Sequence, residues 1–437
     1  MAVRNVNGIL LLYHHYLKAN APTIMEYVNA FPRHSRFPVW AVNTELGFPA
    51  GLENLRFSVV VFHYSLFGMW PYKLNNKFYS YIARDQSSYK VAIFQDEYHY
   101  CKPRFAFVDD AKIDLIYSCY EPKYFDEIYY KYTRVPRVVM ALTGYVSDEM
   151  VALGQRLTVP FDQRSIDVSY RGRDLPFYMG RGAREKTEIA RSFLARSQGL
   201  DLKLDIQVGE DNRIYGEEWY RFLANSKAVL GVESGVSLSD FEDVVRPQVE
   251  QAVLKNPNIP FEEVYEKYLK PLDGKIPIRT ISPRHFEAAA LRVCQILFEG
   301  EYAGVLQPMR HYIPLKKDFS NFDQVIALLR DRDFCHQLVE TAYEELIASG
   351  KYSFMKFIQE FDDRLVESGA RLEPALPGQP DEITPILEAD LPLRKTLHLI
   401  RKSIYRMYQP LRNLPGYKYI KPYLKKILPW RLYPWML

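Results

Sequence analysis

Short apolar segments alternate with helical segments along most of this chain, and this alternation limits the possible folds more than any other feature. Residues 57–65 (FSVVVFHYS) are almost continuously apolar, as expected for a strand buried on both faces of a sheet. Residues 8–16 (GILLLYHHY) predict an earlier strand, and residues 21–31 (APTIMEYVNAF) predict a helix with a proline near its start. Strands and helices in alternation predict parallel sheets built from βαβ units.

The alternation falls into two successive series, which predict two Rossmann-like halves. The first series occupies residues 1–160 and the second residues 161–371, interrupted at 235–275 by a segment that predicts helices and proline-containing turns. A chain of 437 residues is long enough for two domains. We therefore expect an α/β protein of two tandem doubly wound domains, with its ligand in the cleft between them at the carboxyl ends of strands.

The last part of the chain differs in composition from the rest. Residues 372–390 are rich in proline and acidic residues and predict a linker. Residues 391–437 contain eleven Lys/Arg and no Asp/Glu, whereas the preceding residues carry 46 basic and 53 acidic side chains. Apolar residues recur at steps of three and four from position 393, with basic residues on the other face, which predicts a basic amphipathic helix in the tail.

An anionic membrane surface is the partner that this basic, aromatic tail favours. A helix packed on a protein partner and a nucleic-acid-binding arm are the alternatives. The apolar face argues against nucleic acid.

Other sequence features exclude several classes of protein. The four cysteines have no CxxC spacing and no histidines at metal-ligand spacing, so we expect reduced thiols, no metal and a cytosolic location. The N-terminal segment contains only a short apolar run without a small-residue cleavage site, and we expect no signal peptide. No stretch of 18 apolar residues predicts a membrane-spanning helix.

Polar side chains follow several strands of the first predicted half. His14 ends the first strand, His63 ends the third, and Asp96 and Glu97 follow the fourth. A single histidine at a strand end is commonly a satisfied core or turn residue. Several polar strand ends in one sheet converge on one edge, however, and indicate a site. Asp96 and Glu97 are the preferred general-base candidates, because apolar residues directly precede them.

A basic cluster opens the second half, in residues 170–186 (YRGRDLPFYMGRGAREK). One interpretation is a solvated loop and helix face. The other is a diphosphate site, because glycines allow the backbone to approach, arginines bind phosphate oxygens bidentately, and a helix N-terminus follows. The segment matches neither a P-loop nor a clean GxGxxG pattern.

Glu287 lies at the head of an apolar helical run, residues 281–300 (ISPRHFEAAALRVCQILFEG). It is either an acid in the first turn of a helix or a buried carboxylate that waits for a ligand hydroxyl. Glu233 and Ser234 end a predicted strand, where a base or a sugar could lie.

Three stretches together resemble the donor-binding half of GT-B glycosyltransferases: residues 281–300, 302–331 and 342–365. The closer similarity is to bacterial group 1 enzymes and to the glycosyltransferase-like domain of spore-maturation proteins. The resemblance implies a GT-B fold, with Glu287 accepting hydrogen bonds from the ribose of a nucleotide sugar.

The same resemblance implies which basic residues hold the diphosphate of the donor. These are Arg173 and Lys186, with Arg181 as a competitor and Arg284 as a further donor-binding residue. Two departures from the family pattern are visible. The retaining branch often has a second glutamate eight positions before the first, and this chain has Arg279 there. Members of the family also often have a histidine after the strand that in this chain is followed by Gln95.

The expected activity is metal-independent transfer of a hexose from a nucleotide diphosphate sugar to an acceptor hydroxyl, without a further cofactor. Asp96, Glu97 or His63 would act on the acceptor. A lipid-linked acceptor at the inner face of the cell membrane, in cell-envelope polysaccharide or glycolipid assembly, is the expected setting. A catalytically inactive GT-B scaffold and a sugar-nucleotide epimerase are the alternatives.

Overall fold

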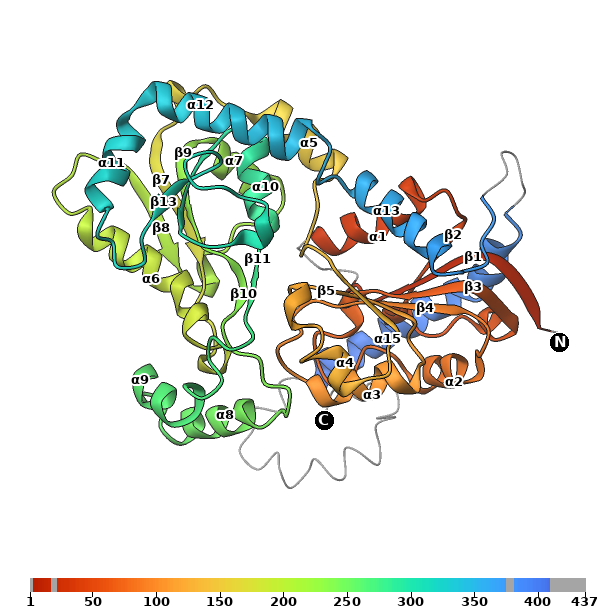
Figure 1. Cartoon of the computed structure of the whole chain (residues 1–437). Helices are drawn as coiled ribbons and strands as arrows, with labels where there is room; N and C mark the ends of the chain where they lie inside the picture. The colour runs from red at the N-terminus through yellow and green to blue at the C-terminus, as the bar shows by residue number, and fades with distance from the viewer. Residues whose placement is uncertain (1–2, 17–21, 375–380, 409–437) are drawn as a thin grey trace.

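The chain forms two α/β lobes, which a computed structural model describes for residues 3–16, 22–374 and 381–408 (Figure 1). The first lobe is built on a six-stranded sheet in the order β2-β1-β3-β4-β5-β6, and every neighbouring pair of strands is parallel. Its strands are β1 (Arg4–Tyr13), β2 (Val39–Asn43), β3 (Leu55–Phe62), β4 (Tyr89–Ile93), β5 (Leu115–Ser118) and β6 (Arg137–Met140). Its helices are α1 (Thr23–His34), α2 (Asn76–Arg84), α3 (Cys101–Asp110) and α4 (Tyr129–Tyr132).

The second lobe is built on a five-stranded parallel sheet in the order β13-β12-β9-β7-β8. Its strands are β7 (Ile166–Gly172), β8 (Leu204–Val208), β9 (Ser226–Gly231), β12 (Cys294–Phe298) and β13 (Ile313–Leu315). Its helices are α6 (Arg181–Arg196), α7 (Glu217–Ala224), α10 (Pro283–Ala290), α11 (Phe322–Arg330) and α12 (Arg332–Tyr343). Two parallel, helix-covered sheets in tandem confirm the predicted fold class and are the arrangement that the resemblance to GT-B enzymes implies.

Buried apolar strands explain why both sheets form. Residues 59–62 of β3 are buried on both faces, because helices of the first lobe cover the sheet from two sides. β12 is buried along its whole length in the same way. Side-chain caps fix helix starts near the cleft, where Ser282 accepts a hydrogen bond from the backbone N–H of Arg284.

The segment 235–275 forms a small helical unit beside the second lobe, as predicted (Figure 1). It contains α8 (Val245–Lys255), α9 (Phe261–Val264) and a single π-helical turn at Tyr265–Leu269. A short antiparallel pair, β10 (Ser234–Val236) and β11 (Ile278–Thr280), closes its base. Gly235 has φ +97, and a Cβ there would lie 2.3 Å from the carbonyl oxygen of Ile278, so this tight closure requires glycine.

The chain crosses between the lobes more than once. α5 (Asp148–Leu157) packs on α7 and α10 of the second lobe, although it belongs to the first series in the sequence. α13 (Phe354–Glu367) returns to the first lobe and packs on α1 (Figure 1). These two crossings tie the lobes together on one side of the cleft.

The C-terminal helices also pack on the first lobe. Part of the segment expected to be a linker forms α14 (Ile383–Glu388), which buries Ile383 and Leu387 in the first-lobe core. α15 (Leu391–Tyr408) follows, and residues 409–437 of the expected tail lie outside the described residues. Among the described residues, no helix combines the length and apolarity that crossing a membrane requires.

Candidate functional site

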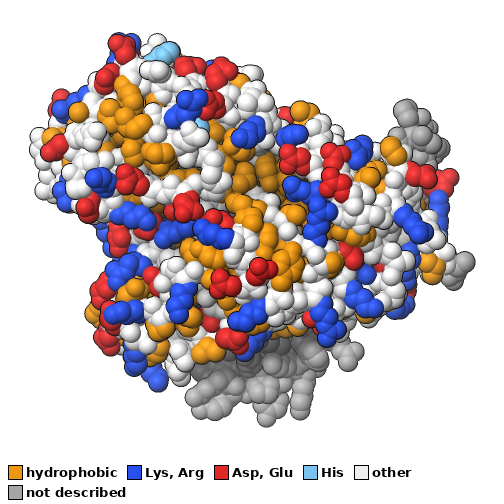
Figure 2. All heavy atoms as spheres, viewed as in Figure 1, with side chains coloured by type: hydrophobic (Ala, Val, Ile, Leu, Met, Phe, Trp, Pro, Cys, Tyr) orange, Lys and Arg blue, Asp and Glu red, His pale blue; other side chains and the backbone are white. Residues whose placement is uncertain are grey.

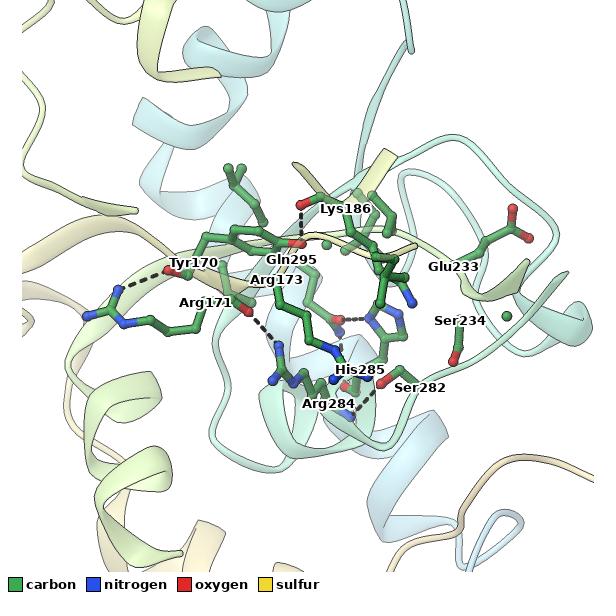
Figure 3. Close-up of a pocket in the computed structure, with 18 of the residues that line it drawn as sticks. Tyr170, Arg171, Arg173, Lys186, Glu233, Ser234, Ser282, Arg284, His285 and Gln295 are labelled. Carbon is green, nitrogen blue, oxygen red and sulfur yellow. Dashed lines mark hydrogen bonds between the residues drawn. The ribbon is translucent and has the colours of Figure 1, made fainter. Parts of the chain in front are cut away.

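A pocket of about 340 Å³ lies between the lobes and is lined from both sides, and Figure 3 labels residues of its second-lobe wall. The first lobe contributes Asp96 and Tyr98, from the loop after β4. The second lobe contributes the ends of β7 and β9, part of α6 and the start of α10. Side chains of both charges also follow the boundary between the lobes on the face shown in Figure 2. The pocket therefore lies in the predicted cleft, at the carboxyl ends of parallel strands.

Five cations of the second lobe line the pocket: Arg171, Arg173, Lys186, Arg213 and Arg284. Arg173 follows β7, Lys186 lies in the second turn of α6, and Arg284 begins α10. Arg284 is held in place, because its Nη1 donates to the carbonyl oxygen of Arg171 at 2.6 Å and its guanidinium lies 4.8 Å from the Trp219 ring. A group of cations in a cleft is suited to bind a polyanion.

Lys186 and Asp96 face each other across the cleft and attract electrostatically. Burial lowers the pKa of Lys186 to about 8; the Asp96 carboxylate opposes this shift, and the nearby Arg173 and Arg284 add to it. Water reaches the Asp96 side chain, but the surrounding protein removes part of its hydration and raises its pKa, while the charge of Lys186 opposes that rise. The pair thus places one carboxylate of the first lobe opposite the cations of the second lobe.

The loop that carries Asp96 is held rigidly by a buried arginine. Asp96 has φ 52, in the left-handed region, and Arg104 donates to the backbone carbonyls of Glu97 at 2.7 Å and His99 at 3.1 Å. Such strain persists only where neighbouring contacts fix the backbone, and it is common at functional sites. Arg104 is thus a positioning residue for Asp96.

Glu97, the second predicted base, points into the first lobe instead of the pocket. Its carboxylate accepts hydrogen bonds from the Ser118 hydroxyl at 2.8 Å, the Cys119 backbone N–H at 2.6 Å and the Tyr129 phenol. Burial raises its pKa, and these hydrogen bonds oppose the rise. Glu97 therefore anchors the loop, and its position does not match the predicted role of a general base.

His63 is also part of the first-lobe interior. Its Nδ1 lies 2.9 Å from the Ser65 hydroxyl, and its ring packs against Tyr27 and Tyr64. Complete burial lowers its pKa to about 3, so the ring stays neutral. It does not line the pocket, and the alternative of a core histidine describes it better than a catalytic role, although its buried Nε2 has no hydrogen-bond partner among the described residues.

Arg181 faces away from the pocket and pairs with Glu262 of the inserted segment at 2.9 Å. The first amides of α6 are also in use: Arg181 N–H donates to Asp273 and Gly182 N–H donates to the Ser237 hydroxyl at 2.7 Å. The insertion therefore caps the helix N-terminus that the sequence suggested for phosphate. Of the residues predicted to hold a diphosphate, Arg173 and Lys186 line the pocket and Arg181 does not.

Glu233 and Ser234 line the pocket beyond the end of β9. Glu233 is buried, accepts the backbone N–H groups of residues 301 and 302, and lies 3.6 Å from Arg279. Arg279, which stands where the resemblance to GT-B enzymes implies a second glutamate, also pairs with Glu185 at 3.2 Å. Arg279 thus pairs with both Glu185 and Glu233 at the edge of the pocket. The Ser234 side chain is more exposed than that of Glu233.

Glu287 is buried in α10 and does not line the pocket itself. Its Oε2 accepts a hydrogen bond of 2.6 Å from the indole Nε1 of Trp219, on α7. Burial raises its pKa, whereas this hydrogen bond and the charge of Arg284 lower it. Glu287 is thus a buried carboxylate whose hydrogen-bond partner in this structure is a side chain of the protein, and the predicted ligand hydroxyl stays a prediction.

Several pocket residues were not predicted from the sequence. Trp219 and Tyr98 are aromatic residues in an aromatic-rich chain, and Arg213 lies in a loop with no phosphate-binding pattern. His285 is buried beside Gln295, and its Nδ1 lies 2.9 Å from the Gln295 amide oxygen. The sequence alone did not distinguish this buried histidine from a core residue. The order of α7 after β8 could have indicated Trp219, because helices that follow sheet strands start at the binding edge.

No group of three or more His, Cys, Asp and Glu side chains among the described residues could hold a metal ion. All four cysteines are buried free thiols. The polar chemistry of the pocket is therefore that of its cations, its carboxylates and its hydroxyl groups.

Comparisons with known proteins give similarity at the level of structure only. No protein-family model matches the chain, and no curated protein matches it. An α-glucosyltransferase in complex with UDP and DNA has 10% sequence identity and a TM-score of 0.48, with 83% of this chain and 100% of that chain covered. Anabaena HepE in complex with UDP and glucose has 9% identity and a TM-score of 0.44, covering 83% and 100% of the two chains. TarM has 10% identity and a TM-score of 0.40, covering 72% and 55%.

Proposed function

We propose that this chain is a glycosyltransferase that moves a sugar from a nucleotide diphosphate sugar to an acceptor hydroxyl. The observation that carries the proposal is the pocket between the lobes, where Arg173, Lys186 and Arg284 face Asp96. Cations on one wall suit a diphosphate, and a carboxylate on the other wall suits an acceptor hydroxyl. The fold supports this division, since each lobe supplies one of the two functions.

In the proposed reaction, the bond between the sugar C1 and the diphosphate oxygen breaks, and its electron pair leaves with the diphosphate. Arg173 and Lys186 offset the charge that develops there. The acceptor oxygen bonds to C1, and its proton passes to Asp96. Because the chain itself supplies the cations, we expect hexose transfer without a metal ion. Closure of the lobes would exclude water and limit hydrolysis.

Other pocket residues would orient the donor. Arg284 lies beside the cations that receive the diphosphate, and Ser234 and Glu233 border the space left for the sugar or the base. Glu287 would accept the ribose hydroxyls, as the resemblance implies. This last role requires Glu287 to part from its present partner, Trp219.

A thermal-shift screen with UDP-, GDP- and ADP-sugars tests the donor site, because a ligand that binds the native state raises the melting temperature. We expect one nucleotide class to stabilise the wild type but neither Arg173→Gln nor Lys186→Gln. Arg191→Gln is the matched control, since Arg191 lies on α6 but pairs with Asp174 outside the pocket. The absence of any shift in the wild type would contradict the proposal.

Asp96→Asn separates binding from transfer. The amide keeps the shape of the side chain but cannot accept the acceptor proton, so we expect normal donor stabilisation and a loss of transfer of about 100-fold or more. Product analysis also distinguishes the alternatives: an inactive scaffold would bind without turnover, and an epimerase would return an isomerised donor. The inactive scaffold is the second candidate because Arg279, which pairs with Glu185 and Glu233, stands where the resemblance implies a glutamate.

We further propose that α15 binds an anionic membrane surface, where a lipid-linked acceptor for cell-envelope or glycolipid assembly would be found. The helix packs with its faces reversed relative to a usual surface helix, because it buries polar residues and exposes apolar ones. Its polar residues Arg394 and His398 face the first lobe, whereas Leu393, Leu397 and Ile400 are 60%, 39% and 51% exposed. An outward apolar stripe flanked by lysine and arginine matches a headgroup layer with anionic lipid.

Vesicle flotation tests this surface. We expect the protein to float with vesicles that contain phosphatidylglycerol and not with pure phosphatidylcholine, and the double variant Leu393→Asp, Leu397→Asp to lose flotation. Leu254→Asp is the control, because Leu254 is an equally apolar and more exposed residue on α8. Equal flotation of all three proteins would contradict a role for α15.

A further inference from the structure

The Trp219 side chain lies between the pocket and Glu287. Trp219 lines the pocket, whereas Glu287 does not, and the two are joined by the 2.6 Å hydrogen bond from the indole Nε1 to Oε2. Both residues are 8% exposed. In this arrangement the indole separates the buried carboxylate from any ligand in the pocket.

The indole satisfies a group that would otherwise be costly. A buried carboxylate requires hydrogen-bond donors, and an unpaired one is strongly unfavourable. The indole N–H is the only side-chain donor to Glu287 among the hydrogen bonds of the described residues, and the guanidinium of Arg284 lies over the Trp219 ring at 4.8 Å. Trp219 thus supplies one donor at the place where a ligand hydroxyl group would supply another.

Trp219 begins a short helix that follows a loop bounded by glycines. Trp219 is the third residue of α7, a helix of only eight residues. The loop before it begins at Gly209 and ends at Gly216, with φ of +143 and +62, and α7 has no side-chain N-cap. Glycines in such conformations at both ends of a loop give the backbone freedom that other residues lack.

We propose that the indole N–H of Trp219 occupies the place of a ligand hydroxyl at Glu287, and that the ribose diol of a nucleotide sugar displaces it. The inference rests on the proposed function, and it names the step by which the donor enters. One N–H···O bond is exchanged for O–H···O bonds of similar strength, so the exchange is close to balanced for one hydroxyl and favourable for two. Trp219 therefore competes with the ligand for Glu287, and this competition favours a nucleotide that carries both ribose hydroxyls.

Removal of the competing donor should strengthen donor binding. Trp219→Phe keeps an aromatic ring and lacks the N–H, so we expect UDP to bind about 5- to 10-fold tighter by calorimetry, the loss of about one hydrogen bond from the free state. Trp40→Phe is the matched control. Its indole also donates to a carboxylate, Asp381 at 3.2 Å, but lies on the first lobe outside the pocket, and we expect wild-type affinity.

Fluorescence of the unmodified protein provides a second measurement that does not depend on folding of a variant. We expect UDP to change the tryptophan emission and 2′,3′-dideoxy-UDP to leave it unchanged, since only a diol displaces the indole. Unchanged or weaker UDP binding by Trp219→Phe, or the same emission change with both nucleotides, would overturn the inference while leaving the proposed donor site intact. Failure of the wild type to bind UDP, GDP or ADP would overturn both.

Discussion

The charge of Lys186 should control donor binding near physiological pH. Burial and the neighbouring Arg173 and Arg284 lower its pKa to about 8, despite the opposing charge of Asp96. The protonated amine binds a diphosphate, and the neutral amine does not. The charged fraction is about 0.9 at pH 7 and about 0.1 at pH 9, so affinity for UDP should fall about tenfold over this range, or about 1.4 kcal/mol.

Calorimetry of UDP binding at pH 7, 8 and 9 measures this loss directly. A bound diphosphate favours the protonated amine, so binding at pH 8 should also take up about half a proton, which titrations in two buffers of different ionisation enthalpy reveal. Lys186→Arg keeps its charge at every pH used and should abolish both the slope and the proton uptake.

Lys227→Arg is the control for the substitution itself. Lys227 belongs to the same lobe but pairs with Asp167 at 2.7 Å, outside the pocket, and its replacement should leave the wild-type pH profile unchanged. An affinity that stays constant from pH 7 to 9 in the wild type, without proton uptake, would show that Lys186 does not meet the diphosphate.

Two further predictions concern stability. Arg164 is buried and donates hydrogen bonds to the backbone carbonyls of four residues, Val159, Ser226, Leu291 and Arg292. Arg164→Met should therefore lower the free energy of unfolding by about 3 kcal/mol or more in denaturant titrations, whereas Arg332→Met, at an exposed residue, should change it little. Equal effects of the two substitutions would contradict the reasoning. Burial raises the pKa of Glu45 to about 7, so the native state loses stability as the pH rises from about 4.5 through 7. Glu45→Gln should therefore raise the melting temperature at pH 8 but not at pH 4.5. A change in melting temperature that is the same at both pH values would be inconsistent with this cause.

The sequence was sufficient to predict the fold class and part of the pocket, because both follow from a general rule. Parallel strands bring their carboxyl ends to one edge, so residues that follow different strands meet there. Asp96 was predicted in this way, whereas Arg173 and Lys186 were predicted from the basic cluster after β7 and from the family resemblance; the structure brings all three to the same pocket. The rule concerns backbone direction, and therefore it works without knowledge of side-chain contacts.

Side-chain direction and long-range contacts explain the predictions that do not match. The left-handed backbone at Asp96 turns consecutive acids to opposite sides, so Glu97 enters the core while Asp96 faces the cleft. The insertion pairs with Arg181 and caps α6, and nothing in residues 235–275 indicated where that segment would pack. Both outcomes depend on neighbours that are distant in sequence.

The packing of α15 has a consequence for how a membrane-bound enzyme of this kind would work. His398 of α15 and His14 of β1 both contact the Glu45 carboxylate, at 3.5 Å and 3.4 Å, and α15 contacts the first lobe through the turn at Thr44–Leu46. These polar contacts turn the apolar stripe of the helix outward. Because they involve the lobe that carries Asp96, a membrane would hold the acceptor side of the pocket next to lipid.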